Sequence, residues 1–396
     1  MVRAYPRYLT ALTQSRASQH CRSSRSRFFP GSSGFASAAS RSVFDSEGSH
    51  PVLFDLFSCV RTTCVAHIMR SVKITEMKLS SNHTLRSLTA GELDYLAITQ
   101  FVVLHAGCLL LFWVGISWIA IAACVAFYCL RIFAVSAGYH RYFSHRSYKT
   151  NRIFQFILAF VGCMSNQKGP LWWAAHHRYH HSHADREDDI HSPGQHGFWW
   201  AHCLWIFSLR YRKADQKLVS TFTEYVELRL LDRFYLFPPI ISVVLLYVSG
   251  VILQRIMPEL HTSGMQMLTW GFFVSTVMVH HAIYSANSIG HCLGTRRFDS
   301  ADNSRNNLIV ALLTFGDGWH NNHHYYQRSA RHGFYWWEID LTHYILKGLS
   351  YVGLVWDLHT PPERIYARAS LAKMQRRSLH SLSDLEANSV VNVASE

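Results

Sequence analysis

Histidine is the residue type of this chain that most strongly indicates chemistry, because 26 of its 396 residues are histidine. Three short clusters stand out: His140-Arg-Tyr-Phe-Ser-His145, His177-Arg-Tyr-His180-His181 and His320-Asn-Asn-His323-His324. A smaller element, Asn287-Ser-Ile-Gly-His291, lies between the second and third clusters. Neutral imidazole is a good ligand for Zn, Cu, Fe and Ni. The clusters therefore predict a transition-metal site.

The spacing within the clusters predicts how the side chains converge. In the pattern H-x-x-H-H, positions i, i+3 and i+4 share one helical face, so each such cluster aims three imidazoles at one volume. His140 and His145 are too far apart to share a face of a continuous α-helix, and we expect them to bracket a helix end. Nine imidazoles exceed the four ligands of one zinc ion but suit two ions, each with an open position.

The remaining histidines and the cysteines are less informative. The nine cysteines include no C-x-x-C pair, which argues against iron–sulfur sites, structural zinc and a disulfide framework. Four histidines stand alone in apolar stretches, and we expect satisfied core residues or surface groups there: His105, His202, His280 and His281. Four more lie near the second cluster without a defined partner and are candidates for supporting or surface roles: His176, His183, His191 and His196.

The hydropathy pattern predicts the elements that must position the clusters. A helix crosses a bilayer with about 20 apolar residues. The uncharged stretch Tyr95–Leu130 predicts two spans joined near Gly115, the second continuing towards Gly138. Phe234–Gln254 and Met265–Ala286 predict two more. The expected fold is an all-α integral membrane protein, with four transmembrane helices in two hairpins and a cytosolic helical cap that holds the histidine-rich site.

The positions of Lys and Arg orient these spans. Fourteen of them lie in segment 131–233, none lies between the first two spans, and only Arg255 lies between the last two. The positive-inside rule then places both termini and all three histidine clusters on the cytoplasmic side. Three other apolar stretches are too short or too polar to cross, and we expect them at the membrane interface or against the cap: Ile153–Gln167, Ile190–Leu209 and the amphipathic segment Phe334–Trp356.

Composition divides the chain into three parts. Residues 1–90 form an N-terminal extension, residues 91–365 the membrane domain, and residues 366–396 a polar tail expected to be disordered. Residues 1–44 hold seven Arg and no acid, which is typical of an organellar transit peptide. The alternative is a disordered extension upstream of a true start near Met69. Residues 1–44, the leader, supply seven of the formal +13 charges. The rest of the chain is therefore not a nucleic-acid-binding surface.

The order H-x-x-x-x-H, H-R-x-H-H, N-S-x-x-H and H-N-x-H-H resembles the membrane-bound fatty acid desaturases, specifically the acyl-CoA delta-9 (stearoyl-CoA) group. The resemblance covers about residues 90–365. The stretch from Gly169 to His181, continuing to Ile190-His-Ser-Pro193, is similar to bacterial-type members. The resemblance implies a four-helix membrane stem under a cytosolic cap, and a di-iron centre that oxidises an acyl chain held in a bent tunnel.

The resemblance also implies how the ligands divide between two iron ions. One iron takes the positions that match His140, His145, His177, His181 and His323. The other takes the positions that match His180, His291, His320 and His324. Asn287 matches a residue that holds an iron-bound water, and we expect it to be catalytic. Because all ten positions are filled, we expect an active enzyme.

The predicted function is oxygen-dependent introduction of a cis double bond, at delta-9, into a saturated long-chain acyl-CoA, as a step of unsaturated fatty acid biosynthesis. Animal acyl-CoA desaturases carry an Arg-Asp pair where this chain has Ala175 and His176, and a Trp where it has Tyr284. An acyl-lipid desaturase is therefore an alternative. Further alternatives are a hydroxylase of the same superfamily and, from another class, a histidine-rich metal transporter or haem-carrying membrane protein.

The reaction implies partners. No protein acid or base can break two unactivated C–H bonds, so iron and molecular oxygen must do so while the protein supplies position. The chain has no Rossmann glycine fingerprint, and by analogy electrons come from a cytochrome b-type haem protein with its reductase, or from ferredoxin. A basic run predicts docking of an acidic donor or contact with lipid headgroups: Arg210, Arg212, Lys213 and Lys217. Eukaryotic members of this family usually lie in the endoplasmic reticulum. We therefore expect this protein in the endoplasmic reticulum membrane, with mitochondrial or plastid membranes as alternatives.

Overall fold

A computed structural model describes residues 92–370 of the chain. The predicted extension 1–90, with its leader and the alternative start at Met69, lies outside the described residues, as does the predicted tail beyond residue 370. The described part is mostly helical, as predicted, and its two-stranded sheet pairs β1 (Lys149–Thr150) antiparallel with β2 (Val355–Trp356).

Three helical segments of the described residues are long and apolar enough to cross a membrane. The first comprises α3 (Tyr95–Cys108) and α4 (Leu111–Val114). The second comprises α5 (Trp118–Phe133) and its continuation η3 (Ala134–Ser144), and the third is α12 (Phe237–Ile256). These segments cover the first three spans that the sequence predicts.

Local signals explain where the first two segments begin. The side chains of Asp94 and Ser117 each accept a hydrogen bond from a backbone N–H in the first turn of their helix. Such first-turn N–H groups have no partner within the helix itself. Between the two segments the chain turns at Gly115, whose φ of 67° lies in the left-handed region that favours glycine. The turn lies where the sequence predicts it.

The fourth predicted span, Met265–Ala286, falls within a continuous helical run of three elements. These are α13 (Gly264–Leu268), the π-helical η8 (Thr269–Val274) and α14 (Ser275–Cys292). The run is not among the three membrane-length apolar helices of the described residues. Length alone would allow it to cross, but its composition is more polar.

Some of the polar groups in this run are hydrogen-bonded to a buried cation of α5. Arg131 is fully buried and donates hydrogen bonds to the hydroxyls of Ser275 and Thr276 and to the carbonyl oxygen of Gly271. Buried polar groups need such partners, because an unpaired one costs free energy. The hydroxyls therefore serve an internal network between α5 and α14.

The cap is built from short helices. In chain order they are α6 (Arg152–Cys163), α7 (Pro170–His183), α8 (Pro193–His196), α9 (Phe198–His202), η4 (Leu204–Phe207), η5 (Leu209–Tyr211), η6 (Gln216–Val219), α10 (Ser220–Thr223), α11 (Val226–Arg233), α15 (Leu308–Leu313), α16 (His320–Tyr325) and α17 (Leu341–Tyr351), with η7 (Pro258–Leu260) in the turn between α12 and α13. Residues 363–370 are helical as well. Ile153–Gln167 contains α6, and Ile190–Leu209 contains only short helices, so their interfacial position stays a prediction.

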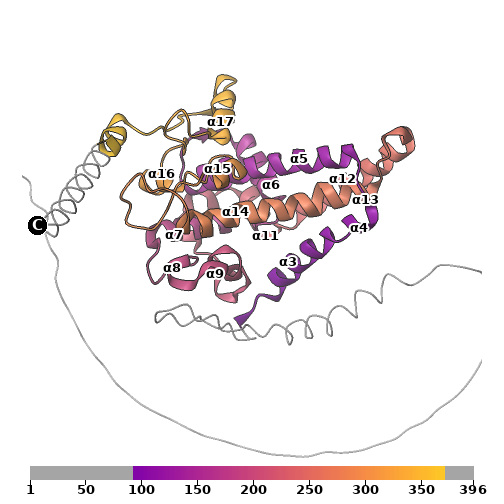
Figure 1. Ribbon diagram of the computed structural model, residues 1–396, viewed down its shortest axis with the longest axis horizontal. Coiled ribbons are helices and arrows are strands. Elements are labelled where there is room, and N and C mark those ends of the chain that lie inside the picture. The colour runs from indigo at the N-terminus through magenta and orange to yellow at the C-terminus, as the bar shows by residue number, and fades with distance from the viewer. Residues whose placement is uncertain (1–91, 371–396) are drawn as a thin grey trace, which may run out of the picture. The chain divides into compact units, whose positions relative to one another are not determined.

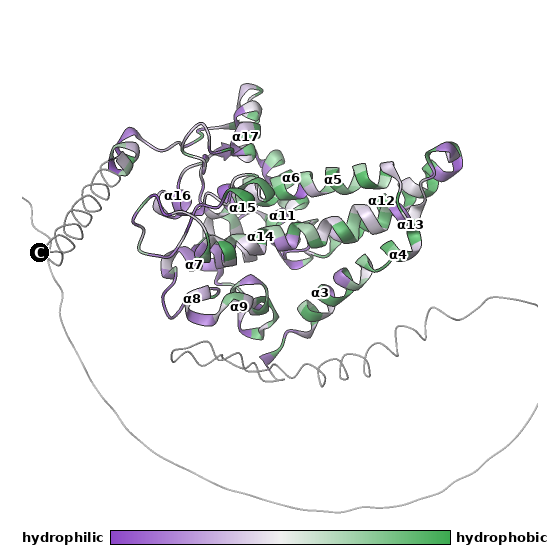
Figure 2. Cartoon of the chain, in the orientation of Figure 1, coloured by the Kyte–Doolittle hydropathy of each residue, from purple (hydrophilic) through white to green (hydrophobic). Residues whose placement is uncertain are grey.

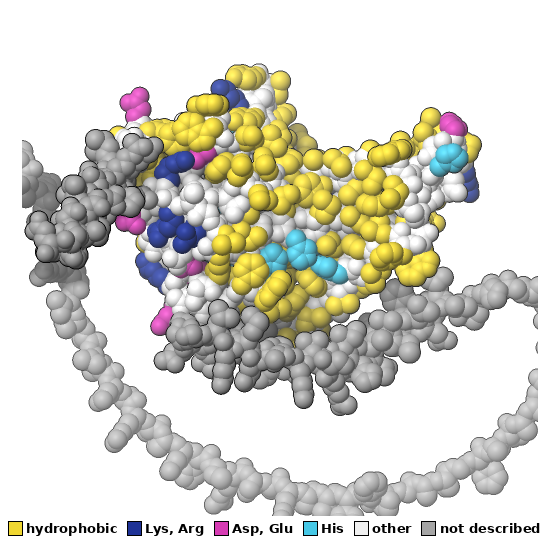
Figure 3. Space-filling view, viewed as in Figure 1, with side chains coloured by type: hydrophobic (Ala, Val, Ile, Leu, Met, Phe, Trp, Pro, Cys, Tyr) yellow, Lys and Arg dark blue, Asp and Glu magenta, His cyan; other side chains and the backbone are white. Residues whose placement is uncertain are grey.

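The long helices run alongside one another, and the cap elements gather at one end of them (Figure 1). α12 packs against α13, while α3 and α5 both pack against η8. Figure 2 shows that α5 and α12 are mainly hydrophobic and that α7, α8 and α16 are mainly hydrophilic. Much of the surface along the long helices is hydrophobic (Figure 3), and large side chains such as Phe112 and Trp118 are more than three-quarters exposed there. Such a broad apolar surface fits a surrounding bilayer.

The second long segment ends at Ser144, so its end lies between His140 and His145, as the sequence predicts. Before that end, α5 widens into the π-helix η3, in which backbone N–H groups bond to the carbonyl five residues back. His145 donates its backbone N–H to the His140 carbonyl at 3.3 Å, and the two rings lie 5.2 Å apart. The two rings approach each other across this helix end because residues five apart lie on nearly the same face of a π-helix.

The segment Phe334–Trp356 is also less regular than predicted. Only α17 is helical, and its first turn is capped by Asp340, which accepts a hydrogen bond from the His343 backbone. Glu338 and Asp340 interrupt the apolar pattern because both are buried in ion pairs, with Arg297 and Arg141. The segment therefore contributes a buried polar network to the cap in addition to its amphipathic helix.

Candidate metal centre

The nine clustered histidines gather into two groups within the cap. The five-histidine group contains His140, His145, His177, His181 and His323. The four-histidine group contains His180, His291, His320 and His324. Within each group, one nitrogen of every ring lies within 4.8 Å of all the others. This membership equals the division implied by the resemblance, while the role of these residues as metal ligands stays a prediction.

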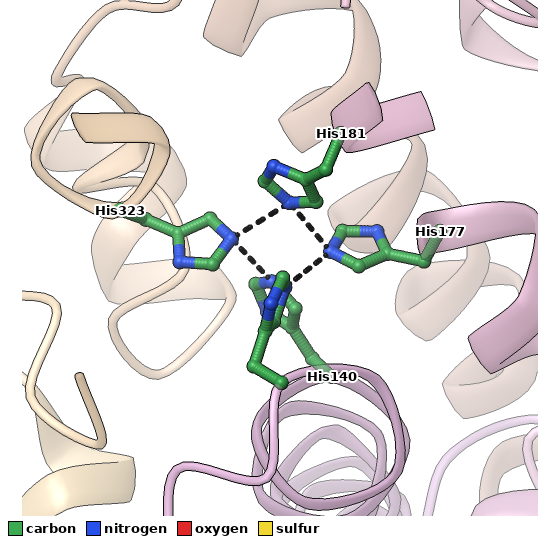
Figure 4. A group of neighbouring side chains, drawn as sticks. His140, His177, His181 and His323 are labelled. Carbon is green, nitrogen blue, oxygen red and sulfur yellow. Dashed lines mark hydrogen bonds between the residues drawn. The ribbon is translucent and has the colours of Figure 1, made fainter. Parts of the chain in front are cut away.

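The nitrogen atoms of the five-histidine group face one another in a ring. His140 Nε2 lies 2.9 Å from His323 Nε2, and His323 Nε2 lies 3.0 Å from His181 Nε2. His177 Nε2 lies 2.9 Å from the Nε2 atoms of both His181 and His145. Figure 4 shows four of these side chains directed at a common centre from η3, α7 and α16.

The four-histidine group draws on α7, α14 and α16. His291 Nε2 lies 3.1 Å from His320 Nε2. His180 Nε2 and His324 Nε2 are buried and have no hydrogen-bond partner in the described chain. Buried nitrogen atoms without partners are costly in a folded protein, so these atoms fit the role of metal ligands.

Two helices divide their histidines between the groups. On α7, His177 and His181 join the five-histidine group and His180 joins the other. On α16, His323 joins the five-histidine group, while His320 and His324 join the other. The spacing argument alone, which aims each cluster at one volume, was wrong on this point. Residues three and four apart lie on either side of one helical stripe, so each helix serves two adjacent groups.

The donor set fits metal ions. Two ligand nitrogens at right angles, each about 2.1 Å from one ion, would be about 3.0 Å apart. The nitrogen–nitrogen distances of 2.9–3.1 Å within the groups match that separation. Hydrogen bonds alone cannot satisfy such a ring, because each neutral imidazole has only one N–H to donate. Imidazole ligands without cysteine suit iron, copper, nickel or zinc.

Four aspartates support the histidines from outside. His180 Nδ1 donates to Asp189 Oδ1 at 2.8 Å, and His291 Nδ1 donates to Asp185 Oδ2 at 2.9 Å. The other two pairs are His324 Nδ1 with Asp302 Oδ2, at 2.7 Å, and His140 Nδ1 with Asp317 Oδ2, at 3.1 Å. A proton held on Nδ1 leaves the Nε2 lone pair directed into the group, as a metal ligand requires.

Sequence reasoning missed these aspartates and His332. Asp185 and Asp189 directly follow the second cluster, but nothing in the sequence separates them from the exposed Asp188. The His332 ring lies 4.4 Å from the ring of His323 and also contacts Asp317. No spacing signal marks His332, because tertiary packing alone brings it to the site.

Electrostatics keep the site in the state that binds metal. Burial holds the pKa of His181, His320 and His323 well below the ordinary histidine value, so these rings are neutral at pH 7. Burial alone would raise the pKa of Asp185, but the hydrogen bond from His291 lowers it to about 2. Neutral imidazoles beside ionised carboxylates are the states that a cationic metal requires.

A cleft adjoins the five-histidine group. Its lining comes from α3, α7, η4 and α14 and includes His177, Asn287 and Tyr284. His176 also faces the cleft, and its ring lies 4.3 Å from that of Trp172, whereas Ala175 is buried in the hydrophobic core.

The isolated histidines have ordinary partners. His105, His281 and His202 form a hydrogen-bonded row with nitrogen–nitrogen distances of 3.0 Å, which ends on the Ser288 hydroxyl. His280 bonds to the Ser165 carbonyl oxygen. His105, His202 and His281 are therefore satisfied groups, as expected, whereas His280 Nδ1 is buried and has no hydrogen-bond partner in the described residues. Among the other candidates, His191 is buried with its ring 4.2 Å from that of His180, and His183 stacks on Tyr179.

Comparison with known proteins identifies the family. The model of the fatty acid desaturase family matches residues 116–358, a range that contains all nine clustered histidines. An acyl-CoA C20 delta-5 desaturase of Anemone leveillei is 35% identical over 256 residues, covering 62% of this chain and 76% of that protein. An sn-1 stearoyl-lipid 9-desaturase of Anabaena variabilis is 33% identical over 278 residues, covering 68% and 96%.

A third relative, delta-9 acyl-lipid desaturase 1 of Arabidopsis thaliana, is 32% identical over 284 residues, covering 71% of this chain and 88% of that protein. The apolar helices and this kinship together make the chain a membrane protein. The family depends on a di-iron centre, and the two histidine groups are able to bind metal. The chain belongs to the fatty acid desaturase family, the membrane oxidoreductases of lipid metabolism.

Proposed function

We propose that this protein introduces a cis double bond at the delta-9 position of a saturated long-chain fatty acyl group, with two iron ions, molecular oxygen and electrons from a partner. The observation that carries the proposal is the pair of histidine groups beside a cleft that His177 and Asn287 help to line. The family membership supports the chemistry, and two delta-9 enzymes among the relatives support the bond position.

The two histidine groups hold the iron ions in this proposal, with five ligands for one ion and four for the other. Asn287, one helical turn before His291 on α14, holds a water on the second ion. The bound iron supplies oxygen activation and the removal of two hydrogens. The protein supplies position: it fixes the ligands through the aspartates and holds the acyl chain so that the reacting carbons face the ions.

The cleft holds the acyl chain. Its walls include Phe101, Trp173 and Ile283, and His177 and Asn287 lie at its metal side. An extended chain in contact with aromatic walls loses water from around the reacting carbons, which keeps the oxidising centre from other substrates. The cleft does not by itself distinguish delta-9 from delta-5, so the bond position rests on the kinship.

The fold of the membrane part completes the proposal. The run from α13 to α14 is the fourth span, so that α3–α4 with α5, and α12 with α13–α14, form two hairpins. In this proposal the protein lies in the endoplasmic reticulum membrane, and both termini and the cap face the cytoplasm. Labelling of single cysteines placed at positions 213 and 261 from the two sides tests this arrangement.

The basic run of the cap docks the electron donor. Arg210, Arg212, Lys213 and Lys217 are all exposed, on or beside η5 and η6. An acidic haem protein of the cytochrome b type, or ferredoxin, is steered to such a surface by charge. The rate at which the donor reduces the protein should therefore fall with ionic strength.

The direct test is expression in a yeast strain that lacks its own desaturase. Growth without added unsaturated fatty acid is the expected result, and gas chromatography should show fatty acids two hydrogens lighter, with the double bond at carbon 9. Products that gain one oxygen would favour the hydroxylase alternative. No product from a well-expressed protein would contradict the proposal.

The carrier of the acyl chain is a separate prediction. Ala175 carries no charge and His176 packs on Trp172, so these positions offer no ion pair to the phosphates of coenzyme A. The relatives act on both acyl-CoA and acyl-lipid chains. We therefore expect the purified enzyme to desaturate stearoyl chains in phosphatidylcholine vesicles as well as stearoyl-CoA. Turnover confined to stearoyl-CoA would contradict this expectation.

A further inference from the structure

The carboxylates that support the histidines are distributed unevenly between the two groups. In the four-histidine group, His180, His291 and His324 each donate Nδ1–H to an aspartate, at 2.7–2.9 Å. In the five-histidine group only His140 faces one, at 3.1 Å. The outer nitrogens of His181 and His323, and that of His320 in the four-histidine group, are buried and have no hydrogen-bond partner in the described chain. One ion position is therefore ringed by three carboxylates and the other by one.

The three carboxylates of the four-histidine group are fixed by the protein itself. Asp189 accepts a hydrogen bond from the Asp185 backbone N–H, and Asp185 accepts one from the Asn303 backbone N–H at 2.7 Å. Asp302 accepts one from the Ser304 backbone N–H at 3.0 Å. The bond from Asn303 to Asp185 ties the loop after α7 to the loop before α15. The orientation of the carboxylates does not depend on an ion at the centre.

The single carboxylate of the five-histidine group is shared. Asp317 Oδ1 lies 3.2 Å from a guanidinium nitrogen of the fully buried Arg141 and accepts a hydrogen bond from the Ser136 hydroxyl at 2.7 Å. The guanidinium, which Asp340 also contacts, offsets part of the Asp317 charge. His140 therefore receives less electrostatic support than the three histidines of the other group.

Carboxylates in these positions change the metal as well as the ligand. An imidazole that donates its outer N–H to a carboxylate is a more basic ligand, and its partner fixes the ring orientation. Nearby negative charge also favours the higher charge on an ion. Loss of one such partner costs about 10–100-fold in metal affinity. Three partners against one should therefore separate the affinities of the two positions by a large factor.

We propose that the two metal positions are unequal, and that the four-histidine position binds its ion more tightly and stabilises its oxidised state more strongly than the five-histidine position does. This inference rests on the proposed function, because it takes the two histidine groups as ligands of two iron ions. Asp185, Asp189 and Asp302 are then positioning residues that act on the metal through the histidines.

Stepwise removal of iron tests the proposal without an activity assay. The full-length protein, purified in detergent and loaded with ⁵⁷Fe, is titrated with a chelator, and retained iron is measured by elemental analysis and Mössbauer spectroscopy. We expect two phases, in which one ion and one spectral component are lost well before the other. The late component should also be the harder one to reduce in a redox titration.

Variants assign the phases to positions. Asp189→Asn and Asp302→Asn keep the shape of the side chain but remove its charge, and each should weaken the late phase by about 10–100-fold while the early phase stays unchanged. Asp188→Asn and Asp299→Asn are matched controls, because both side chains lie nearby in sequence and are exposed. The controls should leave both phases as in the wild type.

The outcomes separate this inference from the proposed function. Iron-free wild-type protein would overturn the proposed function itself. Two irons released in one phase, with a single spectral component, would overturn only the inequality of the positions. Equal loss of both ions in Asp189→Asn and Asp302→Asn would show a merely structural role. If these variants fold poorly, the release phases and reduction order of the wild type still decide the question.

Discussion

Replacing His180 or His323 with alanine is expected to abolish desaturation and to remove iron, while the protein remains folded in the membrane. His180 belongs to the four-histidine group and His323 to the five-histidine group, so each variant removes a nitrogen from a different ion. Loss of an outer-shell partner alone costs about 10–100-fold in affinity or activity, so loss of a ligand should lower turnover below about one hundredth. Measurements of iron per chain and of product by gas chromatography check this result.

His183→Ala provides the matched control on the same helix. His183 lies three residues after His180 on α7, but it stacks on Tyr179 and belongs to neither group. We expect normal iron content and turnover from this variant. Full turnover by His180→Ala or His323→Ala would refute the ligand assignment, and equal losses in all three variants would indicate a general effect on folding.

The second large effect concerns the buried ion network behind the metal site. Asp340→Ala should destabilise the cap by about 3–5 kcal/mol, because it leaves the buried guanidinium of Arg141 without one of its partners. Asp340 Oδ1 lies 3.0 Å from that guanidinium, and its carboxylate also accepts backbone hydrogen bonds from His332 and His343. A fall in the thermal midpoint on the order of 10 °C is expected in detergent.

Asp357→Ala is the control for this prediction. Asp357 also forms an ion pair, with Lys149 at 2.8 Å, but both side chains are more than half exposed. Exposed pairs contribute little because water and salt screen them. The thermal midpoint of Asp357→Ala should match that of the wild type. If the thermal midpoint of Asp340→Ala also matched that of the wild type, the buried network would not stabilise the cap.

The histidine groups were predictable from the sequence because their signal is local. The residues of each cluster lie within five or six positions, and helical periodicity turns that spacing into a shared face. The division of His177 and His180 between two groups was implied only by the family resemblance. Periodicity cannot separate positions three and four residues apart, whereas the packing of α7 against η3 does.

The supporting residues were not predictable because their partners are distant in the chain. Asp185 pairs with His291 and Asp317 with His140, across gaps in which many other acids occur. The π-helical turn that joins His140 to His145 has no simple sequence signature either. The sequence also could not show that Arg131, on another helix, bonds to hydroxyl groups of α14, within the segment predicted as the fourth span.

The metal content of the purified full-length protein tests the central claim most directly. Elemental analysis together with Mössbauer spectroscopy of protein from ⁵⁷Fe-grown cells should find two iron ions per chain, bound by nitrogen ligands. Protein that carries no iron, or a single zinc ion, while well folded in detergent would contradict the account.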